Sequence, residues 1–260
     1  MHIIACIKQV PDTADVKINP ETNTLVREGV ASIINPFDMY AIEEALRLKE
    51  KLGGKTSVVT MGPPQADAAL REAISLGIDD AYLVSDRSFA GSDTLATSYT
   101  LAQAIRKIGD FSIILCGKQA SDGDTAQVGP GIATHLNIPQ VTYVKKIDAA
   151  NKECLKVERM TEEGYEILET PLPCLLTVVK EINEPRLPSL KGKMRAKSAK
   201  IIVLKASELD VEDSRLGLNG SPTQVVKIFS PERKTQAQIF NASAEDSVEK
   251  LLKIFENNAC

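Results

Sequence analysis

The segment from Cys116 to Pro130 combines residue types that suit a phosphorylated ligand. Its sequence, CGKQASDGDTAQVGP, leaves a buried apolar run, turns through glycines and then acquires helical spacing. Where a strand ends and a helix begins, free backbone N–H groups and the helix dipole favour an anion. Gly123, between two aspartates, lets the backbone approach a phosphate without an intervening Cβ atom. We interpret the segment as a candidate nucleotide site, with backbone amides for phosphate and carboxylates for helix capping and ribose hydroxyls.

The same segment also has a purely structural interpretation. Asp124 is followed three residues later by Gln127, which is the spacing of a capping box and needs no ligand. The carboxylates of the segment would also repel a phosphate group. Spacing alone does not decide between phosphate binding and helix capping.

Three further strand-to-helix junctions lie upstream. Residues 90–94 (AGSDT) supply small hydroxyl and amide donors, and residues 61–64 (MGPP) form another junction. The third begins a helix with Asn35 as N-cap, Pro36 in the first turn and Asp38 at N3. Since the carboxyl ends of parallel strands meet at one edge of a sheet, we expect these junctions to open at the same edge.

Such junctions require parallel strands covered by helices, and the apolar pattern predicts them. Nearly continuous hydrophobic runs indicate strands buried on both faces, and spacings of three and four residues indicate helices between them. The expected strands are 3–7, 57–61, 81–84 and 112–116, and the expected helices are 37–52, 65–76 and 94–108. The predicted fold class is α/β, with a mostly parallel, doubly wound, Rossmann-like sheet that binds an adenine nucleotide.

The second half of the chain has a different character. A charged turn between two alternating runs predicts a β-hairpin that leads into one more strand. Residues 186–200 hold six Lys or Arg and no acid, and we expect a basic loop there. The expected elements are strands 155–160, 165–169, 175–179 and 201–204, turns over 214–230, and a helix over 244–255. We expect a nucleotide-binding domain of residues 1–225 and a C-terminal arm of residues 226–260.

Composition argues against several functional classes. The net charge of −4 gives no reason to expect nucleic-acid binding, and no apolar run approaches the roughly 18–20 residues of a membrane span. The start MHIIACIKQV lacks the features of a secretory signal, and five scattered cysteines suit a reducing cytoplasm. With two histidines, no CxxC pair and no Gly-x-Ser-x-Gly elbow, we expect neither a metal site nor a self-contained hydrolase.

The stretch from Val157 to Leu168, followed by PCLLT from Pro173, resembles the diagnostic motif of electron-transfer flavoprotein beta subunits. Further similarities are Asn35-Pro36-Phe37, the run 43–50, Gly117 to Ala120, and Asn183-Glu184-Pro185-Arg186 before the basic segment. The resemblance covers at least residues 1–205. It implies a heterodimer with a larger alpha subunit that carries an electron-shuttling FAD. It also implies that the beta subunit holds AMP or, in a bifurcating branch, a second FAD.

The resemblance also implies which residues act. Leu190, in the basic segment, matches the leucine that family members insert into a partner dehydrogenase. No catalytic side chain is expected, because the flavin does the chemistry. The positions implied to bind the cofactor are Cys6, Asn35, Phe37, Asp38, Met61, Ser92, Asp93, Thr94, Gly117, Gln119, Asp122, Gly123, Asp124, Thr125, Ala126, Gln127 and Val128.

Small residues at 91–98 and 122–126 resemble the bifurcating branch rather than the AMP-holding one. That branch implies an FAD that takes a hydride from NADH and divides the electron pair. One electron goes to ferredoxin or flavodoxin, and the other goes through the alpha-subunit FAD to an acyl-CoA dehydrogenase. Two alternatives remain: a conventional subunit with structural AMP, and a stand-alone adenine-nucleotide-binding protein or hydrolase. The first alternative predicts one FAD and one AMP per heterodimer instead of two FAD.

Overall fold

The computed structural model describes residues 1–12, 17–19, 24–26, 32–226 and 239–258. The chain divides into two units, residues 1–226 and residues 227–260. The second unit contains one described helix, α6 (Ala244–Asn258). No helix in the described part of the chain is long and apolar enough to cross a lipid bilayer.

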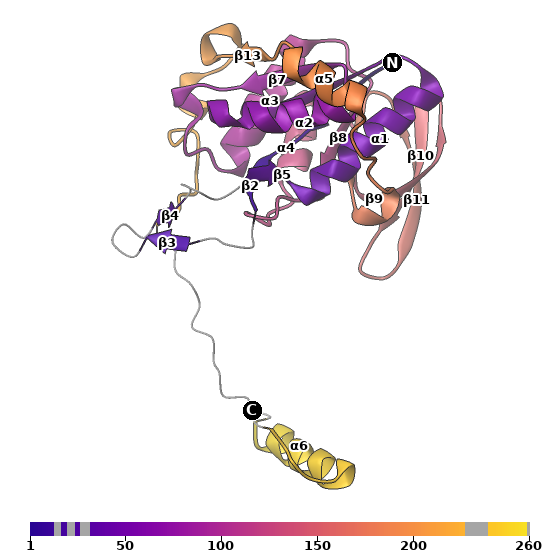
Figure 1. The fold of residues 1–260 in the computed structure, drawn as a ribbon, viewed down its shortest axis with the longest axis vertical. Helices are drawn as coiled ribbons and strands as arrows, with labels where there is room; N and C mark the ends of the chain where they lie inside the picture. The colour runs from indigo at the N-terminus through magenta and orange to yellow at the C-terminus, as the bar shows by residue number, and fades with distance from the viewer. Residues whose placement is uncertain (13–16, 20–23, 27–31, 227–238, 259–260) are drawn as a thin grey trace. The chain divides into compact units, whose positions relative to one another are not determined.

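A nine-stranded sheet forms the centre of the first unit (Figure 1). Its strands are β1 (His2–Cys6), β6 (Lys55–Met61), β7 (Asp80–Val84), β8 (Ile113–Gly117), β9 (Gln140–Ala150), β10 (Cys154–Met160), β11 (Tyr165–Pro171), β12 (Cys174–Val178) and β13 (Ile202–Leu204). They lie in the order β11-β10-β9-β12-β8-β1-β6-β7-β13. The run from β9 to β13 is parallel, and β10 and β11 extend it as an antiparallel hairpin.

Two small antiparallel pairs accompany the main sheet. They are β2 (Gln9–Pro11) with β5 (Ser32–Ile34), and β3 (Lys17–Asn19) with β4 (Thr24–Val26). Single 3-10 turns cover Pro64–Ala66, Arg87–Phe89, Lys180–Ile182, Ala206–Glu208 and Asp213–Arg215.

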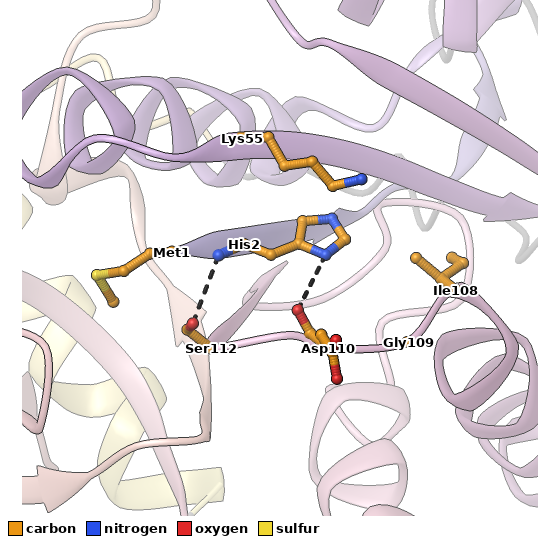
Figure 2. Close-up of a pocket in the computed structure, with 7 residues that line it drawn as sticks. All are labelled: Met1, His2, Lys55, Ile108, Gly109, Asp110 and Ser112. Carbon is orange, nitrogen blue, oxygen red and sulfur yellow. Dashed lines mark hydrogen bonds between the residues drawn. The ribbon is translucent and has the colours of Figure 1, made fainter.

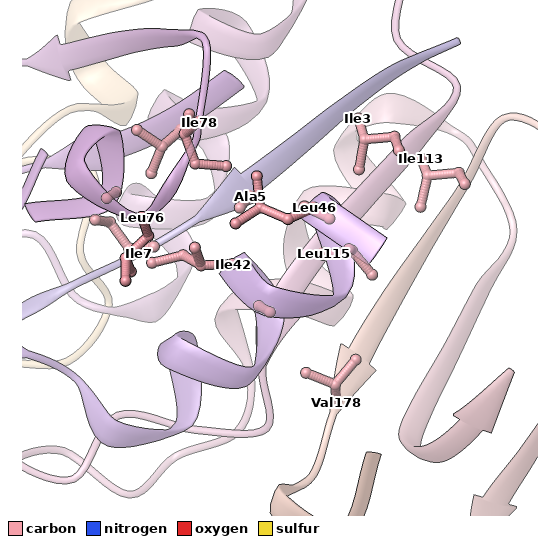
Figure 3. Packing of buried hydrophobic residues seen from close by; sticks show 14 of the residues in the cluster. Ile3, Ala5, Ile7, Ile42, Leu46, Leu76, Ile78, Ile113, Leu115 and Val178 are labelled. Atoms are coloured by element: carbon pink, nitrogen blue, oxygen red, sulfur yellow. The ribbon is translucent and has the colours of Figure 1, made fainter. Parts of the chain in front are cut away.

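Helices cover both faces of the sheet. The helices of the first unit are α1 (Pro36–Leu52), α2 (Asp67–Leu76), α3 (Thr94–Ile108), α4 (Val128–Leu136) and α5 (Leu190–Ser198). Side chains alternate along β1, so that Ile3 and Ala5 pack with α1 and α2, while Ile4 and Cys6 pack with α3 and α4. Figure 3 shows part of the first of these layers, with Ala5 near Leu46 of α1 and Ile3 near Ile113 of β8. The doubly wound α/β class expected from the sequence is confirmed.

The order of the strands defines where a ligand is expected. From β1 the chain passes through α1 to β6 and then through α2 to β7, on one side of β1. It later returns to β8, on the other side of β1. The crevice outside the carboxyl ends of β1 and β8 is therefore the topological switch point, the usual ligand position in open α/β sheets.

Most expected elements of the first half are confirmed to within two residues at each end. In the second half, the expectation for the basic segment 186–200 is wrong, because residues 190–198 form helix α5 instead of a loop. Ser189 accepts a hydrogen bond from the Gly192 N–H and so caps this helix, and Ala196 is buried. Strand β9 was not expected, because its burial follows no regular alternation and its register shifts against both neighbouring strands.

Candidate functional site

Two polar residues at the start of α1 tie the ends of β1 and β8 together. The buried Asp38 carboxylate accepts the Lys8 N–H at 2.7 Å and the Gly117 N–H at 3.2 Å. Asn35 occupies the N-cap position, but its side chain does not cap the helix. It donates to the Gln119 carbonyl at 2.8 Å and accepts the Ser121 N–H at 3.1 Å. Asn35 and Asp38 therefore shape the loop after β8 from beneath.

The contact between α1 and the end of β8 requires a glycine. A Cβ atom on Gly117 would lie 2.3 Å from the Asp38 Oδ1 atom and 2.7 Å from the Phe37 carbonyl carbon. Burial raises the pKa of Asp38 to about 7, although the hydrogen bonds from Lys8, Asn35 and Gly117 oppose the increase. A carboxyl that titrates near neutrality thus lies directly under the switch point.

The loop before α4 combines an unusual backbone conformation with several backbone amides that have no partner among the described residues. Asp124 and Ala126 have φ angles of 52° and 54°, so two non-glycine residues lie in the left-handed region. In the described structure, the backbone N–H groups of Thr125, Ala126, Gln127 and Val128 donate to no other residue. Alternating backbone conformations that point successive N–H groups inward form a known type of anion site. These amides lie at the N-terminus of α4, where the helix dipole adds to the attraction.

The capping-box interpretation of this loop is wrong. Helix α4 begins at Val128, and its N-cap residue, Gln127, makes no side-chain cap. The Asp124 carboxylate instead accepts a hydrogen bond from the side-chain amide of Gln119. The Asp124 backbone is in the left-handed conformation four residues before the first residue of the helix, so its side chain is poorly placed to reach the helical amides. The amides are consequently left for another partner.

Charges around the loop are partly neutralised. The Lys8 ammonium lies 2.6 Å from the Asp122 carboxylate, so this carboxylate repels an anion less than its formal charge suggests. The Lys118 ammonium lies 5.9 Å from the Phe37 ring centroid and 5.3 Å from that of Tyr143. Sequence reasoning missed Lys8 and Tyr143. Lys8 could have been found from its place just after a buried strand, whereas nothing in the sequence signals the contact of Tyr143.

The start of α3 lies beside the start of α4. The Thr94 hydroxyl donates to the Gln127 side-chain oxygen at 2.9 Å and joins the two helix N-termini. The Asp93 carboxylate caps α3 through the Leu95 and Ala96 N–H groups and also accepts from Thr223. Partial burial opposes ionisation, but these hydrogen bonds outweigh it and lower the pKa of Asp93. The Ser92 hydroxyl donates to the Phe89 carbonyl at 2.8 Å.

Most of the expected site residues therefore lie on connected elements at one edge of the sheet. Hydrogen bonds link the start of α1 to the end of β8 and to the loop that follows it. Another hydrogen bond links the start of α3 to the start of α4. Met61 ends β6 at the same edge and is partly buried. The Cys6 side chain is buried beside Cys116, its partner in the β1–β8 register, so only its backbone faces the edge. Leu190 lies elsewhere, on α5, with 78% of its surface exposed.

The thiols of Cys6 and Cys116 are buried in surroundings that make them unreactive. Their mutual hydrogen bond and burial raise the pKa of the Cys116 thiol well above its ordinary value. A raised thiol pKa keeps the group neutral and unreactive. Within the described ranges, no group of three His, Cys, Asp or Glu side chains is arranged to hold a metal ion.

Two cavities flank the core of the first unit. One, of about 500 Å³, lies at the amino ends of the strands, at the edge opposite the switch point (Figure 2). Its lining includes His2, whose ring donates from Nδ1 to the Asp110 carbonyl and accepts the Ser57 hydroxyl at Nε2. Burial, together with Lys55, lowers the pKa of His2, which favours a neutral structural imidazole. The other cavity, of about 330 Å³, lies beside the start of α3 and includes Tyr99, Arg215 and Ser221.

Comparison with known proteins gives a consistent result. A family model described as "Electron transfer flavoprotein domain" matches residues 22–209. A Thermoanaerobacterium thermosaccharolyticum protein named "Electron transfer flavoprotein subunit beta" is 52% identical over 254 residues, covering 97% of each chain. "Caffeyl-CoA reductase-Etf complex subunit CarD" of Acetobacterium woodii is 49% identical and covers 95% of each chain. "Protein FixA" of Bradyrhizobium diazoefficiens is 48% identical over 97% of this chain and 90% of its own length.

Proposed function

The chain belongs to the electron transfer flavoprotein family as a beta subunit, and from this premise we propose that it binds FAD at the carboxyl edge of β1 and β8. A beta subunit implies an alpha subunit as its partner. The observation that carries the proposal is the run of four N–H groups before α4 that have no partner among the described residues. Amides held in this arrangement suit the pyrophosphate of a dinucleotide.

Space in the loop before α4 supports FAD over a smaller nucleotide. A Cβ atom added to Gly123 would meet no atom within 4 Å, and Ala126 offers only a methyl group. Gly123 is exposed and Ala126 is half-exposed. At the neighbouring junction Gly91 packs closely on Leu218, so the space that favours FAD is that of the loop before α4 alone. Asp122 is paired with the Lys8 ammonium, which offsets its charge, and one oxygen of Asp124 accepts a hydrogen bond from the neutral Gln119 amide.

We propose that the cofactor makes this subunit the entry point of electrons. When bound, FAD would accept a hydride from NADH and pass the electrons singly, one to ferredoxin or flavodoxin and one through the alpha-subunit FAD to an acyl-CoA dehydrogenase. The chain's own residues hold and orient the cofactor. Asn35 and Asp38 fix the loop that carries the amides, and Phe37, Lys118 and Tyr143 form an aromatic and cationic rim beside it.

The relative from Acetobacterium woodii supports a partner that acts on CoA esters. The name of that relative places it in a complex with a caffeyl-CoA reductase. For this chain we propose an acyl-CoA dehydrogenase that docks at Leu190, an assembly in the cytoplasm, and an arm over residues 226–260 that packs on the alpha subunit. The exposed apolar residues Val248, Leu251, Leu252 and Phe255 of α6 suit that packing.

An anaerobic titration of the purified heterodimer with NADH tests this function. We expect NADH to bleach the flavin absorption, because the cofactor on this subunit accepts its hydride. A subunit that holds AMP would leave the flavin oxidised in NADH, although a reduced acyl-CoA dehydrogenase would still bleach it. Flavin that stays oxidised in NADH but is reduced by dithionite would contradict the proposal.

A further inference from the structure

The basic segment, residues 186–200, is held to the rest of the first unit by three arginines. Arg186 precedes α5 and donates to Glu43 at 2.8 Å and to Glu50 at 2.6 Å, both on α1. Arg71 and Arg195 act between α2 and α5. Glu43 is only 4% exposed, so Arg186 anchors the segment to a buried carboxylate.

Helices α2 and α5 exchange C-terminal caps. Arg71 of α2 donates to the Ala196 carbonyl at 2.7 Å and the Ala199 carbonyl at 3.2 Å, at the end of α5. Arg195 of α5 donates to the Ile74 carbonyl at 2.8 Å and to the Ile78 carbonyl, at the end of α2. Each cation donates to carbonyls in the last turn of the neighbouring helix or just beyond it, and it lies at the negative end of that helix dipole.

The two helices are also in close steric contact. A Cβ atom on Gly192 would lie 2.0 Å from the Ser75 carbonyl oxygen, so only glycine allows this approach. Asp67, in the first turn of α2, accepts from the Arg71 Nε atom at 2.6 Å and orients its guanidinium. A nine-residue helix is marginal in water, so these tertiary contacts must supply the order of α5.

The face of α5 that these contacts leave outward is apolar and ringed by cations. Leu190 and Met194 are 78% and 65% exposed and lie one turn apart. Leu187, just before the helix, is 90% exposed. Lys191, Lys193 and Lys197 are exposed on the same short helix. An apolar centre with a basic rim is complementary to an apolar pocket bordered by carboxylates on a protein partner.

We propose that Arg71 and Arg195 are positioning residues for docking of the dehydrogenase: by exchanging caps between α2 and α5, they hold Leu190 and Met194 in the orientation that enters the partner's pocket. This inference rests on the proposed docking of an acyl-CoA dehydrogenase at Leu190. A segment that is ordered before binding loses less conformational freedom on association, so the affinity for the partner depends on residues that do not touch it.

The test uses the complete heterodimer and a short-chain acyl-CoA dehydrogenase kept reduced by its saturated acyl-CoA. The variants are Arg71→Lys, Arg195→Lys, Leu190→Ala and the double variant Arg71→Lys/Leu190→Ala. Lysine keeps the charge but lacks the fork that reaches several carbonyls. We expect both lysine variants to raise the KM for the dehydrogenase about three- to tenfold, with kcat and flavin content unchanged. Amides of residues 192–198 should exchange faster with solvent in both variants.

The double variant separates positioning from any other role. If Arg71 acts by orienting Leu190 and Met194, part of its effect is already lost when Leu190 is removed, so the KM of the double variant should rise by less than the product of the two single effects. Arg106→Lys is the matched control, because Arg106 likewise donates to a last-turn carbonyl of a neighbouring helix, that of His135 in α4. Its KM should equal that of the unmodified heterodimer.

Three results would overturn the inference. The first is an unchanged KM in Arg71→Lys and Arg195→Lys while Leu190→Ala raises it, which would leave the docking site intact but remove the positioning role. The second is a KM in the double variant equal to the product of the two single effects. The third is an unchanged KM in Leu190→Ala, which would remove the docking proposal itself.

Discussion

Asp38 illustrates how one side chain can organise a ligand site without facing the ligand. Its two oxygens accept N–H groups from the ends of two neighbouring strands, Lys8 after β1 and Gly117 at the end of β8. These bonds favour the carboxylate, whereas complete burial favours the neutral acid, and burial prevails. Ionisation of Asp38 in the folded chain therefore lowers the free energy of unfolding.

The stability contributed by Asp38 should depend on pH. Its pKa in the folded chain, about 7, is above the ordinary value of 3.8, so the protonated residue stabilises the fold fully below about pH 3.8. This contribution is lost as the pH rises to about 7, by on the order of 4 kcal/mol. In urea unfolding, the stability advantage of the wild type over Asp38→Asn should shrink from about pH 5 to about pH 8. A difference that stays constant or grows with pH would contradict the burial argument.

The residue scale is also where the sequence is least informative. Asn35 and Asp38 were expected at the site, and they do lie there, but spacing suggested a local capping role. Their actual partners are Gln119, Ser121 and Gly117, more than 75 residues away along the chain. Local patterns show which residues are available to a helix N-terminus. They do not show which distant loop competes for the same hydrogen bonds.

At the scale of elements, the loop before α4 and the start of that helix form the proposed binding site for the phosphates of the cofactor. Two non-glycine residues in the left-handed region turn the backbone so that successive amides face the same way. Conformations of this kind cost roughly 1–2 kcal/mol each and persist where the surrounding structure enforces them. Strain at this loop is consistent with selection for ligand binding rather than for stability alone.

Substitution of Ala126 tests the role of that backbone. Ala126→Val places a β-branched residue at a φ angle of 54° and should disfavour the loop conformation by roughly 1–2 kcal/mol. We expect the FAD content attributable to the beta subunit to fall, measured after denaturation of the heterodimer.

Asn137→Val is the matched control for this substitution. Asn137 ends the same helix in the same left-handed conformation, with a φ angle of 57°. The control should lose similar stability and keep its FAD. Equal loss of FAD in both variants would mean that the helix, not the loop before it, determines binding.

Elements differ in how well the sequence predicts them. Helix α3 has the predicted limits, because the Asp93 cap and an apolar stripe are both local signals. Helix α5 was expected as a loop, since glycine, proline and a run of cations obscure its periodicity. Its order comes from the arginines and the close approach of Gly192 to α2, which are tertiary features. Strand β9 was missed for a similar reason, because its bulges interrupt the alternation.

At the scale of the whole molecule, the chain consists of a sheet-based unit and a separate C-terminal unit. Helix α6 exposes Val248, Leu252 and Phe255 by 56%, 55% and 65%. A soluble helix with this much exposed apolar surface needs a partner, and an isolated helix of 15 residues is marginal in water. Its proposed partner is the alpha subunit.

Hydrogen exchange can test that assignment. In the isolated chain we expect the amides of residues 244–258 to exchange rapidly, because Val248, Leu252 and Phe255 are each more than half exposed there. In the heterodimer they should be protected. Equal protection in both samples would show that α6 is stabilised by its own chain, and equally fast exchange would show that it does not pack on the alpha subunit.

The central claim is that the switch point of β1 and β8 holds FAD, and a nucleotide inventory of the purified heterodimer tests it most directly. The heterodimer is denatured, and the released FAD and AMP are separated by chromatography and counted per complex. We predict two FAD and no AMP per heterodimer, and the loss of one of the two FAD in Ala126→Val. One FAD and one AMP per complex would contradict it and would make this chain a holder of a structural nucleotide.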